Sequence, residues 1–270
     1  MKSRAASFRE AGTGAGVVCV HASASSSGQW RPLMDRLADR FRVLAVDLHG
    51  YGQSPAWPDD RGLSLADEAA LLEPVFRAAG DRFHLIGHSY GGAVALRAAL
   101  ADPGRLASLV LFEPVLFGVL MQEDPEQPAA REIASVRDDT NAAVDRGDLA
   151  RSAERFVDYW MGGGAWASTP EKRRTAVANA MPKVKAEWHA LFTEPTPLAA
   201  FARLAVETLY IVGAESPASS RGVARLLTSA LPSVTTVEVP GVGHMGPVTH
   251  PDTINAAIAA FVDRVAGASA

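Results

Sequence analysis

One five-residue segment constrains the fold of this chain more strongly than any other: residues 87–91 read Gly-His-Ser-Tyr-Gly. The segment follows an apolar run at residues 83–86 and opens an apolar stretch with helical spacing at residues 91–101. A serine in this setting sits on a sharp turn between a strand and a helix, where flanking glycines avoid collisions between the two elements. We therefore predict that Ser89 is a nucleophile held at the carboxyl end of a buried strand.

Short apolar runs alternate with helical patterns through most of the chain. Residues 17–20 and 43–46 are rich in valine and bounded by turn residues, which is typical of buried parallel strands. This alternation predicts an α/β fold in which a mostly parallel sheet is covered by helices on both faces. Ser64 is expected to cap one of these helices. Further strands are expected at residues 83–86, 106–112, 208–212 and 234–239, and helices at 28–40, 64–79, 91–101, 219–231 and 252–265.

The alternation stops between residues 117 and 200, where helical patterns occur without a convincing strand. Helices are expected there at residues 129–146, 149–161 and 170–191. We interpret residues 117–200 as a helical cap inserted into a core domain formed by residues 1–116 and 201–270. The three glycines at residues 162–164 are expected to form a mobile entrance loop, because glycine restrains the backbone little.

Length and composition exclude several classes of function. A chain of 270 residues fits one α/β domain with an insertion better than two independent domains. The formal charge of -4 argues against a nucleic-acid partner, which requires clustered lysine and arginine. Cys19 is the only cysteine, so no intramolecular disulfide can form. No stretch approaches the roughly 18 apolar residues of a membrane span. We expect a cytoplasmic protein that acts on a small molecule, with no membrane partner.

No pattern typical of a metal or nucleotide cofactor emerges. The sequence contains no Walker loop, no pair of neighbouring cysteines and no HExxH segment. The glycines at residues 12–16 precede a strand instead of following one, so they indicate a tight turn and not a dinucleotide loop. We expect the chemistry to be carried by side chains, without metal or cofactor.

A serine hydroxyl is a weak nucleophile until a neighbouring base takes its proton. His244 is the best candidate, because it follows the last expected strand in a Gly-Val-Gly-His segment. A loop at that position can reach the carboxyl edge of the sheet, where Ser89 is expected. The other six histidines are expected to be structural or solvated: His21, His49, His84, His88, His189 and His250.

Four segments resemble the α/β-hydrolase superfamily in their order and spacing. They are His-Ala-Ser at residues 21–23, Asp-Leu-His-Gly-Tyr-Gly-Gln-Ser at residues 47–54, the serine segment, and Gly-His-Met at residues 243–245. The resemblance implies an eight-stranded, mostly parallel sheet flanked by helices, with the cap inserted after the sixth strand. It also implies that the backbone N–H groups of Ser23 and Tyr90 form an oxyanion hole. Alanine stands before Ser23 where many relatives have glycine.

The acidic partner of the histidine departs from the commonest family pattern. Most relatives carry an aspartate in a Gly-x-x-Asp turn after the seventh strand, and here that position holds Ser216. Glu215 is adjacent, but a shift by one residue redirects a side chain in a tight turn. Glu113 ends an apolar strand, at the position from which some haloalkane dehalogenases of this superfamily supply their acid. We favour Glu113 as the acid over Glu215.

These residues predict a hydrolase that transfers an acyl group to water. Serine at position 89 disfavours the dehalogenase and epoxide hydrolase reactions, which use an aspartate nucleophile in this superfamily. We expect a carboxylesterase for small or medium apolar esters that works through an acyl-enzyme on Ser89, with Trp166 of the cap facing the substrate. Hydrolysis of lactones or of carbon–carbon bonds is an alternative with the same residues. A catalytically silent ligand-binding module is an alternative of another class.

Overall fold

A seven-stranded sheet forms the centre of the part of the chain that the computed structural model describes, residues 5–58 and 61–268. The strand order is β1-β3-β2-β4-β5-β6-β7, and all neighbours are parallel except β1, which runs antiparallel to β3. The strands are β1 (Phe8–Ala11), β2 (Ala15–Val20), β3 (Phe41–Val46), β4 (Phe83–His88), β5 (Leu106–Phe112), β6 (Thr208–Gly213) and β7 (Val234–Val239).

The predicted α/β-hydrolase architecture is confirmed, but the predicted strand count is wrong. Seven strands occur among the described residues instead of eight, because only one strand, β1, precedes the first parallel strand β2. For the same reason the long helical segment follows β5, the fifth strand of the chain, and not the sixth.

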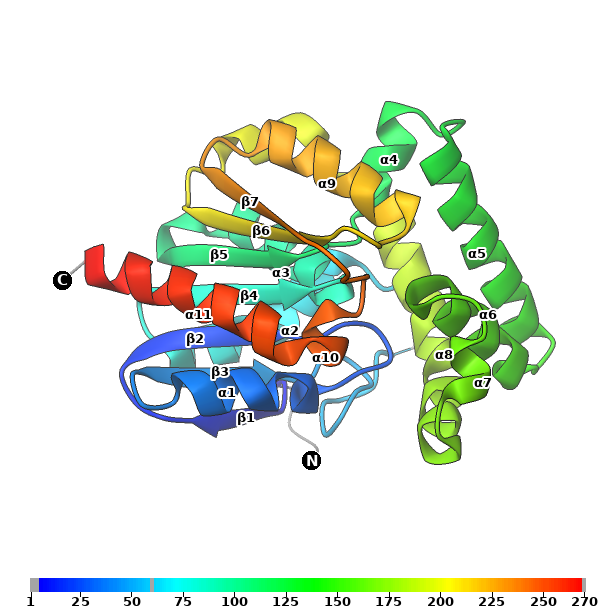
Figure 1. Cartoon of the computed structure of the whole chain (residues 1–270), viewed down its shortest axis with the longest axis horizontal. Helices are drawn as coiled ribbons and strands as arrows, with labels where there is room; N and C mark the ends of the chain where they lie inside the picture. The colour runs from blue at the N-terminus through cyan, green and yellow to red at the C-terminus, as the bar shows by residue number, and fades with distance from the viewer. Residues whose placement is uncertain (1–4, 59–60, 269–270) are drawn as a thin grey trace.

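Helices cover both faces of the sheet, as the alternating pattern predicted (Figure 1). Val17 and Cys19 of β2 point into one layer of the core, and Val18 and Val20 point into the other, because successive strand residues face opposite sides. The first layer is closed by α1 (Arg31–Leu37) and α11 (Pro251–Ala268), and the second by α2 (Leu65–Ala79), α3 (Tyr90–Ala101) and α9 (Ala218–Ala230).

The predicted cap of α2 is confirmed. The Ser64 side chain accepts a hydrogen bond from the Asp67 backbone N–H, and the Asp67 carboxylate accepts one from the Ser64 backbone N–H. This reciprocal pair satisfies N–H groups that the first turn of a helix leaves unpaired. The helix expected at residues 28–40 is instead a 3₁₀ turn, η1 (Ser27–Trp30), that leads directly into α1.

Residues 117–192 fold entirely into helices and connecting turns. In Figure 1 this segment lies beyond the carboxyl ends of the parallel strands, on the side to which their arrows point. None of the described helices is long and apolar enough to cross a membrane. The helices of the segment are α4 (Phe117–Glu123), α5 (Pro128–Asp145), α6 (Leu149–Met161), α7 (Ala165–Ser168) and α8 (Glu171–Phe192).

Candidate active site

Ser89 occupies a strained turn between β4 and α3. Its backbone has a φ of 56°, a conformation that residues other than glycine rarely adopt, and its N–H donates to the Phe112 carbonyl at 3.0 Å. A Cβ at Gly91 would lie 2.4 Å from the His21 carbonyl oxygen, so only glycine fits beside the serine. The turn therefore fixes the Ser89 hydroxyl at the carboxyl edge of the sheet.

His244 comes to Ser89 from the loop between β7 and the short helix α10 (Gly246–Thr249). Its Nε2 lies 2.9 Å from Ser89 Oγ, and its Nδ1 lies 2.6 Å from Glu113 Oε2. All three side chains are buried. A ring that donates from Nδ1 to the carboxylate leaves Nε2 free to accept the serine proton. This is the arrangement that a general base requires.

Glu113 reaches the histidine from the end of β5, where it has a φ of 43°. Its Oε1 accepts hydrogen bonds from the Gly213 backbone N–H at 2.7 Å and from the Ser216 hydroxyl. Glu215, the other candidate acid, is exposed on the turn after β6. The structure thus brings Glu113 to the His244 ring and leaves Glu215 facing solvent.

His88 holds the backbone of His244 in place. Its Nε2 donates to the His244 carbonyl oxygen at 2.9 Å, and its Nδ1 lies 3.0 Å from the Gln29 side-chain nitrogen. Burial lowers the pKa of His88 well below the ordinary value, so the ring is neutral at pH 7 and keeps this donor and acceptor pattern. We expected His88 to be structural or solvated, and its ring is directed to the loop that carries His244.

Trp160 of α6 covers the face of the His244 ring. The two ring centroids are 4.1 Å apart and the planes are inclined by 31°. Trp160 is 6% exposed, so the imidazole is shielded from bulk water on this side. An aromatic face at this distance favours a positive charge on the ring.

The backbone around Ser23 leaves a donor free beside the nucleophile. The Ala22 N–H donates to the Gln29 side chain and the Ala24 N–H donates to the Tyr51 hydroxyl. Among the hydrogen bonds of the described residues, none uses the N–H of Ser23 or of Tyr90. Free N–H groups on these two segments are what an oxyanion hole needs.

A pocket of about 250 Å³ opens above the Ser89 hydroxyl. Core residues form its floor, and apolar residues of the helical segment form its wall. The residues lining it are Ala22, Ser23, Ala24, Ser89, Phe156, Val157, Trp160, Met161, Thr169, Pro170, Arg173, Val177, His244, Met245 and Val248. The lining is mostly apolar, which suits an apolar substrate.

Trp166, which we expected to face the substrate, is not among these lining residues. Its backbone N–H donates to Asp158 at 2.8 Å, and the Arg174 guanidinium lies 6.0 Å from its ring centroid. Trp160, six residues earlier in the chain, lines the pocket as we expected Trp166 to do. Trp160 lies on α6 and Trp166 on α7, so which tryptophan points inward depends on how these two helices pack over the core.

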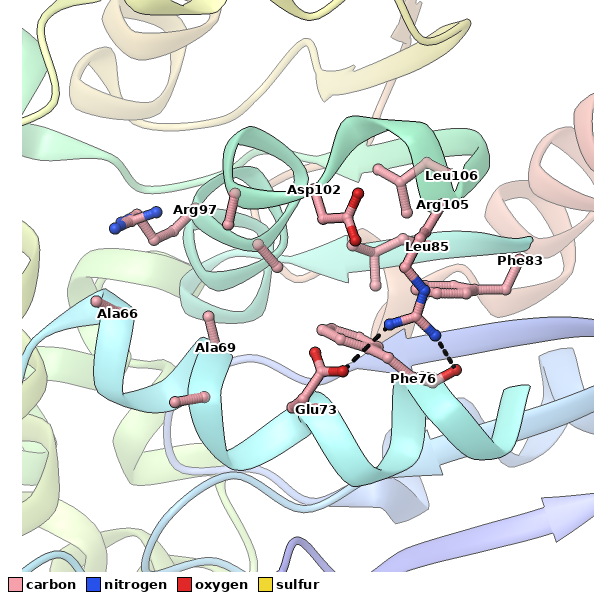
Figure 2. A pocket seen from close by; sticks show the side chains of 13 residues that line it. Ala66, Ala69, Glu73, Phe76, Phe83, Leu85, Arg97, Asp102, Arg105 and Leu106 are labelled. Carbon is pink, nitrogen blue, oxygen red and sulfur yellow. Dashed lines mark hydrogen bonds and ion pairs between the residues drawn. The ribbon is translucent and has the colours of Figure 1, made fainter. Parts of the chain in front are cut away.

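A second cavity, of about 360 Å³, lies between α2 and α3 near the amino end of β4 (Figure 2). Phe83 and Leu106, at the starts of β4 and β5, line it, so it is at the edge of the sheet opposite Ser89. Its Glu73 and Arg105 side chains form an ion pair at 3.2 Å. No serine, cysteine or histidine is among its lining residues, and it is separate from the candidate active site.

Several residues of the site carried no recognisable sequence signal. Trp160, Gln29 and Ser220, whose Oγ lies 3.3 Å from His244 Nδ1, meet the site only through the fold. The sequence marked Ser216 only as the residue at the usual position of the acid, and not as a contact of Glu113.

In the described part of the chain, no group of three or more histidine, cysteine, aspartate or glutamate side chains is placed to hold a metal ion.

Comparison with known proteins agrees with this fold. Residues 17–257 match the sequence model of the Alpha/beta hydrolase family. A pimeloyl-[acyl-carrier protein] methyl ester esterase of Edwardsiella ictaluri is 28% identical over 254 residues, which cover 92% of this chain and 93% of that protein. The structure of a thermophilic esterase from Thermogutta terrifontis is similar with a TM-score of 0.74 and 26% identity, covering 96% of this chain and 93% of the other.

Proposed function

The chain belongs to the α/β-hydrolase family, and from this premise we propose that it is a serine carboxylesterase with Ser89, His244 and Glu113 as its catalytic triad. The single observation that supports this most is the continuous chain of hydrogen bonds from Ser89 Oγ through both ring nitrogens of His244 to Glu113. The esterase names of similar proteins support the reaction class.

In the proposed reaction, Ser89 Oγ attacks the carbonyl carbon of the ester while His244 Nε2 takes the serine proton. The carbonyl oxygen becomes an oxyanion, which the N–H groups of Ser23 and Tyr90 stabilise. Collapse of this intermediate breaks the bond to the alcohol oxygen, and the His244 imidazolium returns its proton to the leaving alcohol. A water molecule, deprotonated by His244 in the same way, then hydrolyses the acyl-enzyme and restores Ser89.

Glu113 stabilises the imidazolium that forms in both halves of this reaction. Its carboxylate is buried, and its second oxygen is held by Gly213 and Ser216, so it cannot rotate away from His244. Trp160 contacts the face of the His244 ring, where it excludes water and stabilises the positive charge of the imidazolium. Preorganised groups of this kind need no rearrangement at the moment of reaction.

We assign residues 117–200 the role of a cap that closes the substrate pocket over the core formed by residues 1–116 and 201–270. Phe156, Trp160, Met161 and Val177 of this segment contribute an apolar wall to the pocket. The volume of about 250 Å³ supports a small or medium apolar ester as substrate.

Hydrolysis of p-nitrophenyl acetate, butyrate and octanoate by the purified protein tests this function. We expect turnover of the shorter esters and a loss of roughly 10⁶-fold in kcat for Ser89→Ala. A serine-directed phosphonate should label Ser89 alone. Activity that survives in Ser89→Ala would contradict the proposal, and failure to hydrolyse any of these esters, or a lactone or diketone, would indicate a binding protein.

A further inference from the structure

A small recess adjoins the Ser89 hydroxyl and shares Ser23, Phe156 and Trp160 with the larger pocket. Its volume is about 10 Å³, which leaves room for roughly one water molecule or one substituent of that size. Its walls are aromatic and aliphatic apart from two serines and one carboxyl group. The lining residues are Ser23, Ser89, Val115, Phe117, Phe156, Trp160, Val184, Glu187, Trp188 and Leu191.

Glu187 is the only titratable residue in that lining, and one of its oxygens has no partner. Its Oε1 lies 3.1 Å from Lys183 Nζ, whereas Oε2 is buried and has no hydrogen-bond partner among the described residues. The residue is 1% exposed, and burial raises the pKa of its carboxyl, whereas Lys183 and the nearby Ser23 and Tyr51 hydroxyls lower it. The Ser23 and Tyr51 hydroxyls lie near this carboxyl, but neither makes a hydrogen bond to Oε2. A buried acceptor without a donor is costly, so a further donor is expected to fill it.

Glu187 is not needed to neutralise Lys183. Glu68 already accepts a hydrogen bond from Lys183 Nζ at 2.8 Å, and its oxygens also accept the Tyr90 hydroxyl at 3.2 Å and the His49 backbone N–H at 3.1 Å. Glu68 is therefore a fully paired counterion. The second carboxyl adds an unpaired acceptor to the wall of the recess, beside the nucleophile.

We propose that Glu187 binds a hydroxyl group on carbon 2 or 3 of the acyl part of the substrate, so that hydroxy-acid esters are preferred over unsubstituted esters. This inference rests on the proposed esterase function. The free Oε2 supplies the acceptor, and the volume of the recess fits one hydroxyl. A cationic substituent is disfavoured, because the Lys183 ammonium already contacts this carboxyl.

The acyl part is assigned to the recess because of the order of events in the reaction. The alcohol must leave first, and the larger pocket opens beside Met161 and Val248, which are 48% and 49% exposed. The acyl group stays bound to Ser89 after the alcohol has left. The residues that line the recess are all buried or half-buried, so a group held there belongs to the part of the substrate that is released last.

The test compares ethyl butanoate with each enantiomer of ethyl 2-hydroxybutanoate and ethyl 3-hydroxybutanoate, with hydrolysis followed by acid release. For the wild-type protein we expect kcat/KM to be about 10- to 100-fold higher for at least one hydroxy ester, as for a hydrogen bond to a buried carboxyl. Glu187→Met should remove most of this ratio. Dividing the wild-type ratio by the variant ratio cancels the different intrinsic reactivities of the esters.

Glu68→Gln is the matched control. It weakens the other carboxylate contact of Lys183, and Glu68 does not line the recess. Its hydroxy-ester preference should equal that of the wild type. Wild-type hydrolysis of ethyl butanoate without preference for any hydroxy ester would overturn the inference and leave the esterase function standing. Absence of hydrolysis for every ester would instead overturn the esterase function. A preference that Glu187→Met keeps in full would overturn the inference too, and Glu187→Leu takes its place if the methionine variant fails to fold.

Discussion

The Ser216 hydroxyl donates a hydrogen bond to Glu113 Oε1, the carboxylate oxygen that also accepts the Gly213 N–H. Ser216 stands where most members of the family carry the triad acid. In this protein the carboxylate comes instead from the end of β5, and the residue at the usual position fixes its orientation. The proposed acid therefore stands on another strand, with its Oε2 2.6 Å from His244 Nδ1.

Glu113→Gln should lower kcat for p-nitrophenyl butyrate by roughly 10⁴-fold, because an amide cannot stabilise the imidazolium as a carboxylate does. Circular dichroism should show an intact fold, since the replacement has the same shape. Glu215→Gln is the control, and the exposed side chain should tolerate it with no measurable change. The opposite ranking of the two variants would show that Glu215 is the acid.

The position of Ser216 suggests that the acid can be returned to the usual turn. Adding Ser216→Asp to Glu113→Gln should recover at least about tenfold of the lost kcat, because the new carboxylate starts within hydrogen-bond reach of the side chain that contacts His244. Ser216→Asp alone should be harmful, since two buried carboxylates would face each other. A double variant no better than Glu113→Gln would contradict this arrangement.

The sequence predicted the parallel strands because their signal is local. Valine-rich runs such as those in β2 and β3 are buried on both faces, so their composition alone identifies them. Strand β1 was not predicted, because Phe8–Ala11 is largely exposed and is a strand only through its pairing with β3. Helix α4 was also missed, because its seven residues are too few to show a helical period.

The parts of the site that escaped prediction depend on contacts between distant elements. Ser89 and His244 lie in short motifs, whereas the recess exists only where α8 packs over the Ser89 turn. Nothing in the sequence around Glu187 distinguishes it from a solvated helix glutamate. Gly162 and Gly164 have φ values of 96° and 84°, which explains why glycine stands at these positions. The mobility expected of residues 162–164 stays a prediction.

Stability should fall as the solution is acidified below neutrality. Burial lowers the pKa of His84 from 6.5 to about 4. Between these values the unfolded chain binds a proton at His84 that the folded protein does not bind, so the free energy of unfolding falls as pH falls through this window. The whole window accounts for at most about 3 kcal/mol.

Urea unfolding at a series of pH values measures this dependence. His84→Leu should give a shallower decline of the free energy of unfolding between pH 6.5 and 4, even if its stability at pH 7 is lower. The lowered pKa values of His21 and His88 act in the same direction, so some decline should remain in the variant. An identical slope in the variant and the wild type would refute the assignment to His84.

The two neighbouring tryptophans of the helical segment provide the sharpest test of how it faces the core. Trp160 stacks on His244 at 4.1 Å and lines the pocket, while Trp166 does neither. Trp160→Leu should lower kcat by about tenfold, because water gains access to the ring and the imidazolium loses the aromatic face, a contribution on the order of 1–2 kcal/mol. Trp166→Leu removes a ring of the same size six residues away and should leave kcat within about twofold.

Both variants need the same two measurements, kcat for p-nitrophenyl butyrate and the melting temperature. A loss of packing alone would lower stability without changing turnover of the folded protein. Equal losses of kcat in the two variants would mean that the segment acts on the site as a whole, and the specific role of the Trp160 ring would then be wrong.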